Sequence, residues 1–434
     1  MTGTYLAHGL GGRSDLPVPL WLALYAGAAA VLVSFAALVV LWTKPRLRGR
    51  QGGVPLPAAV TRAADSPVVR TAVRVLGVLA LAGFLAVAWG GPASSADNPA
   101  PAWFYAWFWV GLVALSLVLG PVWRMANPLR TLASMVRSRA NRPLPARIGY
   151  RPATAGMLAF LWLELAFPHS DAPRAVAVFV TVYALVHLVA GVVYGPAWFD
   201  RADTFEVYFG LVAALSPIGR RDDGRLVLRN PLDGLLTVDR ARGLTPFVLV
   251  VLGSTAFDGL TRLPVWTDTT RELGGVASAL LATAGLAAAI GLVSGAYAGA
   301  IRLTRPFLRR GTEPYREFAH SLVPIMVGYT VAHYFSFAAF EGQQGVLLAT
   351  DPFGLGWDLF GTAGTAVDYT AVPVAVIAAV QIAGIVAGHV LGVVSAHDRA
   401  LGVLRRDHVK AGQYPVLALM VGYTAVGIYL VSGA

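Results

Sequence analysis

Cysteine is absent from this chain of 434 residues. Its absence excludes disulfide bonds, thiolate nucleophiles, cysteine-ligated zinc, iron–sulfur clusters and covalently attached c-type haem. Any metal site in the protein must therefore use histidine and carboxylate side chains.

Charged residues are scarce. They make up 13% of the chain, whereas a soluble protein carries about a quarter. Hydrophobic residues make up 56%, and the mean hydropathy is +0.63. This composition predicts an integral membrane protein. The net charge is +11, but the arginines stand between apolar runs and form no basic stripe with aromatic residues, so we expect no nucleic-acid partner.

Long apolar runs predict an all-α fold, a polytopic transmembrane helix bundle that forms one domain over residues 1–434. About 20 apolar residues are needed to cross the core of a bilayer. The apolar stretch 204–216 is too short for that, and we expect a re-entrant or interfacial segment there. About ten spans are predicted, near 19–42, 71–91, 102–124, 153–167, 174–198, 245–262, 273–300, 318–340, 372–397 and 414–432.

The placement of basic residues predicts the orientation. If the N-terminus lies outside, 28 of the 34 Lys and Arg residues fall in five inner loops, as the positive-inside rule requires. This scheme places the multi-pass protein in a bacterial plasma (inner) membrane with both termini outside. It makes 1–18 an outer segment and 341–371 a long outer loop without Lys or Arg. The inner loops are 43–70, 124–152, 218–243, 301–317 and 398–413.

Ionisable side chains at membrane depth are costly and usually functional. Asp258 and Glu164 lie near the outer ends of their predicted spans, with His169 just beyond one of them, and His333 and His8 should lie on the same side. Imidazoles and carboxylates without sulfur are typical of a divalent metal site, with zinc or copper as the metal. We expect His8, His169 and His333 as ligands, and Asp258 and Glu164 as catalytic residues that bind the metal or activate its water. The alternative is that each residue makes an interhelical hydrogen bond or faces water at the headgroups.

Three further histidines, His187, His320 and His389, are predicted at the middle and inner depths of the bundle. They would serve as relay groups if the protein moves ions. His333 and His389 lie at different predicted depths, so we do not expect them to hold a haem between two helices.

Three stretches together resemble a known family. They are His8-Gly-Leu-Gly-Gly-Arg-Ser-Asp-Leu-Pro-Val-Pro, His320-Ser-Leu-Val-Pro-Ile with Ala332-His333-Tyr334-Phe335-Ser336, and Gly388-His389 with Ala396-His397-Asp398-Arg399. The combination resembles the fenitrothion hydrolase-like family of bacterial and archaeal integral membrane proteins. The resemblance implies hydrolysis of an organophosphate-like ester at the membrane, and it supplies no catalytic residues that transfer by position.

Three functions follow as alternatives. The first is a membrane-embedded hydrolase, metal-assisted, that acts on a lipophilic ester at the outer face and takes its substrate from the lipid bilayer. The second is an ion- or metal-coupled transporter or channel that uses buried His, Asp and Glu residues. The third is a non-catalytic membrane subunit, for which the sequence indicates no particular protein partner.

Overall fold

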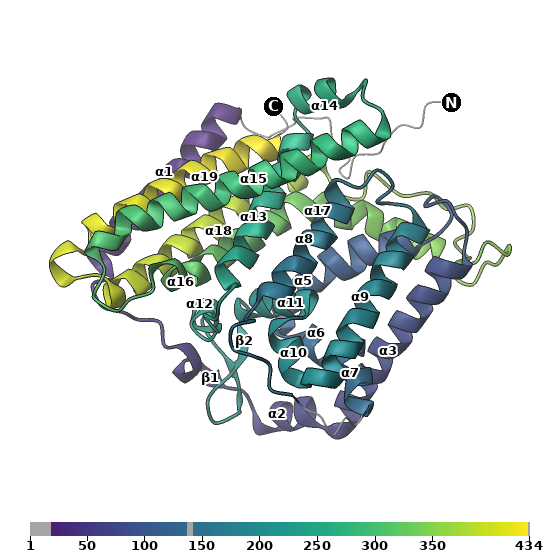
Figure 1. The fold of residues 1–434 in the computed structure, drawn as a ribbon, viewed down its shortest axis with the longest axis horizontal. Coiled ribbons are helices and arrows are strands. Elements are labelled where there is room, and N and C mark those ends of the chain that lie inside the picture. Colours follow the sequence, from purple (N-terminus) through teal and green to yellow (C-terminus); the bar gives the residue numbers. More distant parts are fainter. Residues whose placement is uncertain (1–18, 137–141, 433–434) are drawn as a thin grey trace.

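The computed structural model describes residues 19–136 and 142–432, and helices make up nearly all of their regular structure (Figure 1). Within these residues, nine helical segments are long and apolar enough to cross a membrane. They are α1 (Leu20–Leu41), α3 (Pro67–Gly90), α4 with η2 and α5 (Ala100–Leu119), α9 (Pro173–Tyr194), α13 (Leu244–Thr261), α15 with η3 (Gly275–Phe307), η4 with α17 (Ala319–Leu348), α18 (Val374–Val403) and η6 with α19 (Ala411–Ser432).

The predicted all-α polytopic fold is thus confirmed, and each of these segments coincides with a predicted span. The predicted span at 153–167 is α8 (Arg151–Leu165), which has 15 residues and is about 22 Å long. Although α8 is short for a bilayer core of about 30 Å, it runs from one side of the bundle to the other. At its start the Tyr150 amide donates to Arg242 O (2.7 Å), and beyond its end the Tyr105 hydroxyl donates to Ser170 O (2.8 Å). We therefore count α8 as a tenth crossing.

Shorter elements connect the spans. The helices are α2 (Ala58–Asp65), α6 (Val122–Ala126), α7 (Pro128–Met135), α10 (Pro196–Arg201), α11 (Thr204–Ala214), α12 (Pro231–Leu235), α14 (Pro264–Thr270) and α16 (Pro314–Glu317), with single turns η1 (Gly49–Gln51) and η5 (Arg406–His408). Three short antiparallel strands, β1 (Val54–Pro55), β2 (Ile218–Arg220) and β3 (Leu226–Leu228), form a sheet in the order β1-β3-β2.

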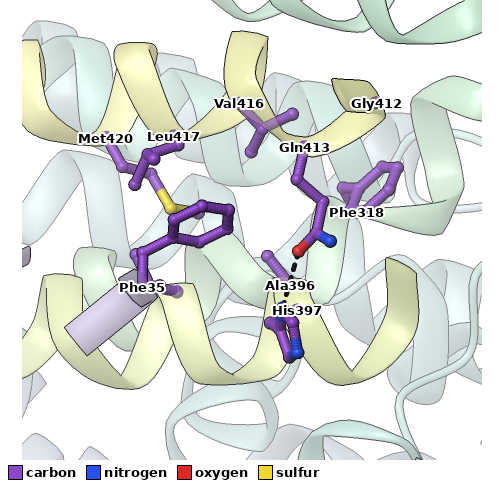
Figure 2. Close-up of a pocket in the computed structure, with 10 residues that line it drawn as sticks. Phe35, Phe318, Ala396, His397, Gly412, Gln413, Val416, Leu417 and Met420 are labelled. Carbon is purple, nitrogen blue, oxygen red and sulfur yellow. Dashed lines mark hydrogen bonds between the residues drawn. The ribbon is translucent and has the colours of Figure 1, made fainter. Parts of the chain in front are cut away.

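The ends of α1 and α19 lie on the same side of the bundle. Leu20 and Ala23 pack near Ile428 and Val431, so the first described turns of the chain adjoin the last. At the opposite end, each ring nitrogen of His397 on α18 contacts a carbonyl oxygen: Nδ1 contacts Gln413 Oε1 (2.8 Å) and Nε2 contacts Trp42 O (2.9 Å). Figure 2 shows this His397–Gln413 hydrogen bond; both residues line a cavity of about 20 Å³, large enough for about one water molecule. The contacts tie α1, α18 and α19 together at that end.

The five predicted inner loops contact one another, which places them on one side of the bundle. The sheet joins 43–70 to 218–243, and the isolated bridge between Leu308 and Leu404 joins 301–317 to 398–413. Glu317 forms ion pairs with Arg240 and Arg399, which connects three of the loops. This is the arginine-rich side. Figure 1 shows the sheet, α2 and α12 together at the same edge of the molecule.

The long outer loop is shorter than predicted. Helix α17 continues through the first eight residues of the predicted loop 341–371 and ends at Leu348. The extension is held by indole groups: Trp107 Nε1 donates to Gly342 O (3.0 Å) and Trp103 Nε1 to Gly345 O (2.9 Å). The polar residues that follow position 340 are compatible with a helix, but they interrupt the apolar run. The hydropathy pattern therefore predicts an end of this span that is eight residues too early.

Helix α11 enters the bundle and returns to the same side. Thr204 Oγ1 donates to Ala153 O (3.2 Å), and Ser216 Oγ donates to Val118 O (3.2 Å). Ala153 and Val118 both lie at the arginine-rich ends of their helices. Ten of the eleven residues of α11 are buried. The segment is therefore enclosed by protein, as a non-spanning segment at membrane depth must be, and the prediction of a re-entrant segment agrees with this arrangement.

Candidate functional site

Asp258 and His333 form the centre of a buried polar cluster between three helices. Asp258 lies one turn before the end of α13, and His333 lies in the first half of α17. The Asp258 carboxylate contacts His333 Nε2, and both side chains are almost completely buried. Arg262, which ends α13 one turn after Asp258, places Nη2 3.0 Å from the same imidazole nitrogen.

Asp258 and Arg262 require different protonation states of His333 Nε2. An arginine only donates hydrogen bonds, so Arg262 requires a lone pair on His333 Nε2. A carboxylate only accepts, so an ionised Asp258 requires a proton on the same atom. One ring nitrogen cannot satisfy both partners at once. A proton that moves from His333 to Asp258 reverses the direction of the Asp258–His333 hydrogen bond and gives Nε2 a lone pair toward Arg262.

Glu164 adds a second carboxylate from a third helix. It lies at the end of α8 and is buried, and the Tyr334 hydroxyl donates to Glu164 Oε1 at 3.0 Å. Within residues 19–136 and 142–432, Glu164 Oε2 and His333 Nδ1 have no hydrogen-bond partner. Glu164 and Asp258 lie close enough to interact electrostatically. Unsatisfied buried polar atoms are rare and are typical of sites that take up a proton, ion or ligand.

A pair of hydroxyl groups connects this cluster with helix α11. The hydroxyls of Tyr208 and Thr330 lie 3.3 Å apart, which joins α11 to α17. Thr330 stands three and four residues before His333 and Tyr334, so all three lie on one face of α17. The Tyr208 ring stacks on Trp109, whose centroid is 4.4 Å away, and this fixes its orientation.

The residues next to Tyr208 on α11 reach an aqueous cavity on the arginine-rich side. This cavity has a volume of about 700 Å³, and Glu206, Val207 and Gly210 contribute to its lining. Asp203 and Glu206 hold the first turn of α11, because Asn127 Nδ2 donates to Glu206 (2.9 Å) and the Tyr183 hydroxyl donates to Asp203 (2.7 Å). Helix α11 thus contributes both to the lining of this cavity and, through Tyr208, to the contact with Thr330.

Of the predicted outer residues, the structure brings together Asp258, Glu164 and His333. His169 does not join them, because it follows the end of α8 on the exposed surface, where its ring packs against Phe167. His8 lies outside the described residues. Among those described, no group of three or more His, Asp or Glu residues is arranged to hold one metal ion. His8, His169 and His333 as ligands of a zinc or copper ion therefore stay a prediction.

The three inner histidines have separate surroundings. His187 accepts a hydrogen bond from Trp198 Nε1 (2.9 Å), and His389 uses Nδ1 on the carbonyl of Ile385 one turn earlier (2.8 Å). His320 is buried near the Glu317 ion pairs with Arg240 and Arg399. The three histidines have different neighbours, and no contact among them is present in the described residues.

The sequence patterns did not indicate three residues that complete the cluster, namely Tyr334, Thr330 and Tyr208. Tyr334 and Thr330 share helix α17 with His333, and a search at helical spacing would have found Thr330. Tyr208 carries no signal of this kind, because its role depends on the re-entry of α11 into the bundle.

Comparisons of this chain with models of protein families, with curated proteins and with solved structures found no match.

Proposed function

We propose that this membrane protein is a proton-coupled carrier in which Glu164, Asp258 and His333 take up and release the coupling protons. One observation supports this most directly: two carboxylates and an imidazole from three membrane-crossing helices meet in the protein interior, with two of their polar atoms unsatisfied. Ionisable groups at membrane depth are typical of proton relays and ion pathways. We place the protein in the plasma membrane with its arginine-rich side toward the cytoplasm.

The arrangement of α11 supports a route for the proton. Irregular or short helices at membrane depth expose polar groups in many transporters. Here α11 contributes Glu206 and Val207 to the lining of the 700 Å³ cavity, and the next residue, Tyr208, contacts Thr330, one turn from His333. Protons would enter through the cavity, pass the Tyr208–Thr330 hydroxyls and reach His333 and Asp258. Arg262 stands at the outer end of this path and balances the charge of the deprotonated cluster.

An imposed electrical potential tests the proposal. Purified protein is reconstituted in liposomes that contain a pH-sensitive dye, and a potential, negative inside, is applied with and without a mixture of candidate solutes outside. We expect acidification faster than in protein-free liposomes, and we expect Asp258→Asn and Glu164→Gln to lose most of this rate. Asp268→Asn is the matched control, because Asp268 is an exposed carboxylate on α14 that pairs with the exposed Arg271. A wild-type rate equal to that of protein-free liposomes in both conditions would overturn the proposal.

A second function uses the same residues. The Asp258–His333 pair has the arrangement of an acid–base pair, in which a carboxylate orients an imidazole and leaves its other nitrogen, Nδ1, without a partner in the described chain. An apolar cavity of about 810 Å³ lies between α13, α15 and α19, and Ala256 and Leu260, on either side of Asp258 in the sequence, contribute to its lining. A lipophilic ester would fit a cavity of this size and polarity. This supports the hydrolase predicted from the resemblance.

Ester hydrolysis in detergent and proton movement in liposomes together distinguish the two functions. A hydrolase releases acid from an organophosphate ester in detergent, without a membrane potential, and its rate falls in His333→Ala. A carrier shows no ester turnover above that of the same variant. If His333→Ala abolishes hydrolysis but Glu164→Gln leaves proton movement unchanged, the hydrolase replaces the carrier as the account of this site.

A further inference from the structure

The 700 Å³ cavity on the arginine-rich side is lined by five arginines, which are Arg50, Arg124, Arg220, Arg221 and Arg229. The lining of the cavity comes from separate segments, which include η1, the β2–β3 hairpin and α11. The distribution of their ion pairs shows which of these charges are available to a ligand.

Two of the arginines are neutralised by carboxylates. Arg124 pairs with Asp200 (2.8 Å) and Arg220 with Asp65 (2.7 Å). The acidic residues of the lining are mostly occupied as well, since Arg130 pairs with Asp200 and Glu206, and Arg201 pairs with Asp239 (2.7 Å). The remaining carboxylate, Asp222, is exposed in the turn between β2 and β3.

The charges of the other three arginines are not balanced by an ion pair within the described residues. Within the described residues, Arg50 and Arg221 form no ion pair with a carboxylate. Arg229 donates to the carbonyls of Ser216 (3.3 Å) and Ala214 (3.3 Å), which are neutral acceptors just after and at the end of α11. Asp233 is the carboxylate that interacts with Arg229, and it already accepts the Arg48 amide (2.6 Å).

Arg229 is held rigidly in this position. A Cβ atom at Gly219 or at Gly234 would lie 2.4 Å from its guanidinium nitrogens, so both glycines are needed to seat the side chain. Arg50 lies close enough to repel it electrostatically. Two guanidinium groups of the same charge beside one cavity stabilise an anion between them, and arginine matches the oxygens of phosphate with paired hydrogen bonds.

We propose that this cavity binds a phosphate group between Arg50, Arg221 and Arg229. The phosphate comes either from a soluble phosphate compound or from the headgroup of an anionic lipid at the inner surface of the membrane. The cavity volume lies within the range of small-molecule sites. The phosphate would lie in the cavity through which the proposed proton route begins, but its binding uses these arginines and not Asp258, so the proposal does not rest on the carrier function.

Equilibrium dialysis of the detergent-purified protein against radiolabelled inorganic phosphate, at constant ionic strength in chloride, tests the soluble source. Nanodiscs of phosphatidylcholine with or without phosphatidylglycerol test the lipid source, with native mass spectrometry to count retained phosphatidylglycerol. Saturable phosphate binding assigns the soluble source. Retained phosphatidylglycerol without phosphate binding assigns the headgroup.

Substitutions locate the site. The double variant Arg50→Gln with Arg221→Gln should weaken binding about tenfold or more, because two charge-assisted hydrogen bonds are lost. Arg225→Gln is the matched control, since Arg225 lies in the same hairpin outside the cavity lining. Arg50→Lys with Arg221→Lys keeps the charge and should retain part of the binding, which separates ligand loss from misfolding. The proposal is overturned if the wild type binds in neither arm, or if Arg225→Gln weakens binding as much as the double variant does.

Discussion

At the scale of single residues, the account depends on His333 Nε2, which meets Asp258 and Arg262 at the same time. The two partners require opposite states of this nitrogen, so the position of one proton decides the contacts of three side chains. Glu164 is only partly satisfied: one carboxylate oxygen accepts a hydrogen bond from Tyr334, and the other has no partner in the described residues.

Removal of the Tyr334 hydroxyl should affect both stability and function. Tyr334→Phe leaves Glu164 Oε1 without its donor, and an unsatisfied buried group of this kind lowers the free energy of unfolding by about 1–3 kcal/mol. We expect a lower Tm in detergent and slower proton movement in liposomes. Tyr429→Phe is the control, because Tyr429 lies 41% exposed on α19. Equal effects of the two substitutions would contradict the role given to Tyr334.

At the scale of elements, α17 and α18 approach each other most closely at glycines. A Cβ atom on Gly328 would lie 2.3 Å from Gly384 O and 2.9 Å from Gly388 Cα. Small residues let membrane helices pack backbone to backbone, which positions the α17 residues of the cluster against their neighbours.

Gly328→Ala should therefore destabilise the bundle by about 1–3 kcal/mol, because the added methyl group meets backbone that cannot move aside. Gly402→Ala on α18 is the matched control. Apart from its chain neighbours and the nearby backbone of its own helix, no atom of the described residues lies within 4 Å of its added Cβ, and alanine favours a helix by up to about 1 kcal/mol over glycine. Thermal unfolding of both variants in the same detergent checks the prediction, and a Tm for Gly328→Ala at or above that of wild type would refute it.

The loop between α17 and α18 should respond to acid. The Ala363 amide (3.0 Å) and then the Thr350 hydroxyl (2.9 Å) donate to Asp358, and they hold the pKa of its carboxyl below the ordinary value of 3.8. Since the folded pKa is depressed, the stabilisation is present above the unfolded pKa of about 3.9 and is lost as the pH falls through the folded value.

Hydrogen exchange at the Ala363 amide measures this effect. After correction for the intrinsic exchange rate, we expect protection at neutral pH that decreases below about pH 4. Asp358→Asn should remove most of this pH dependence. Protection that stays constant across the acid range in the wild type would show that Asp358 does not hold the loop.

Sequence patterns predicted most of the elements, since apolar runs mark each membrane-crossing helix and arginines mark one side. They also found Asp258, Glu164 and His333, because a charged residue stands out in an apolar run. They could not show which way His169 faces, since a residue just beyond a helix end can face either the bundle or water. The partner from α11, Tyr208, was beyond prediction, because its position depends on how α11 folds back between other helices.

At the scale of the whole molecule, the account predicts a bundle with its arginine-rich side in the cytoplasm. The contacts among five loops place them on one face, and the outer loop between α17 and α18 lies opposite. The natural sequence contains no cysteine, so single cysteines can be introduced without any background labelling.

A membrane-impermeant maleimide in whole cells tests this orientation. We expect a cysteine at Thr365, exposed in the outer loop, to react in intact cells. A cysteine at Asp223, exposed in the β2–β3 hairpin, should react only after the membrane is opened. The reverse pattern would invert the orientation and place the phosphate-binding cavity outside the cell.

The central claim is that the buried cluster exchanges protons, and infrared difference spectroscopy of the reconstituted protein between mildly acidic and mildly alkaline buffers tests it most directly. The account predicts a reversible band from a protonated carboxyl group in the wild type that is missing or shifted in both Asp258→Asn and Glu164→Gln and unchanged in Asp268→Asn. Spectra that are identical in the wild type and in both cluster variants would show that Glu164 and Asp258 do not exchange protons, and the claim would be wrong.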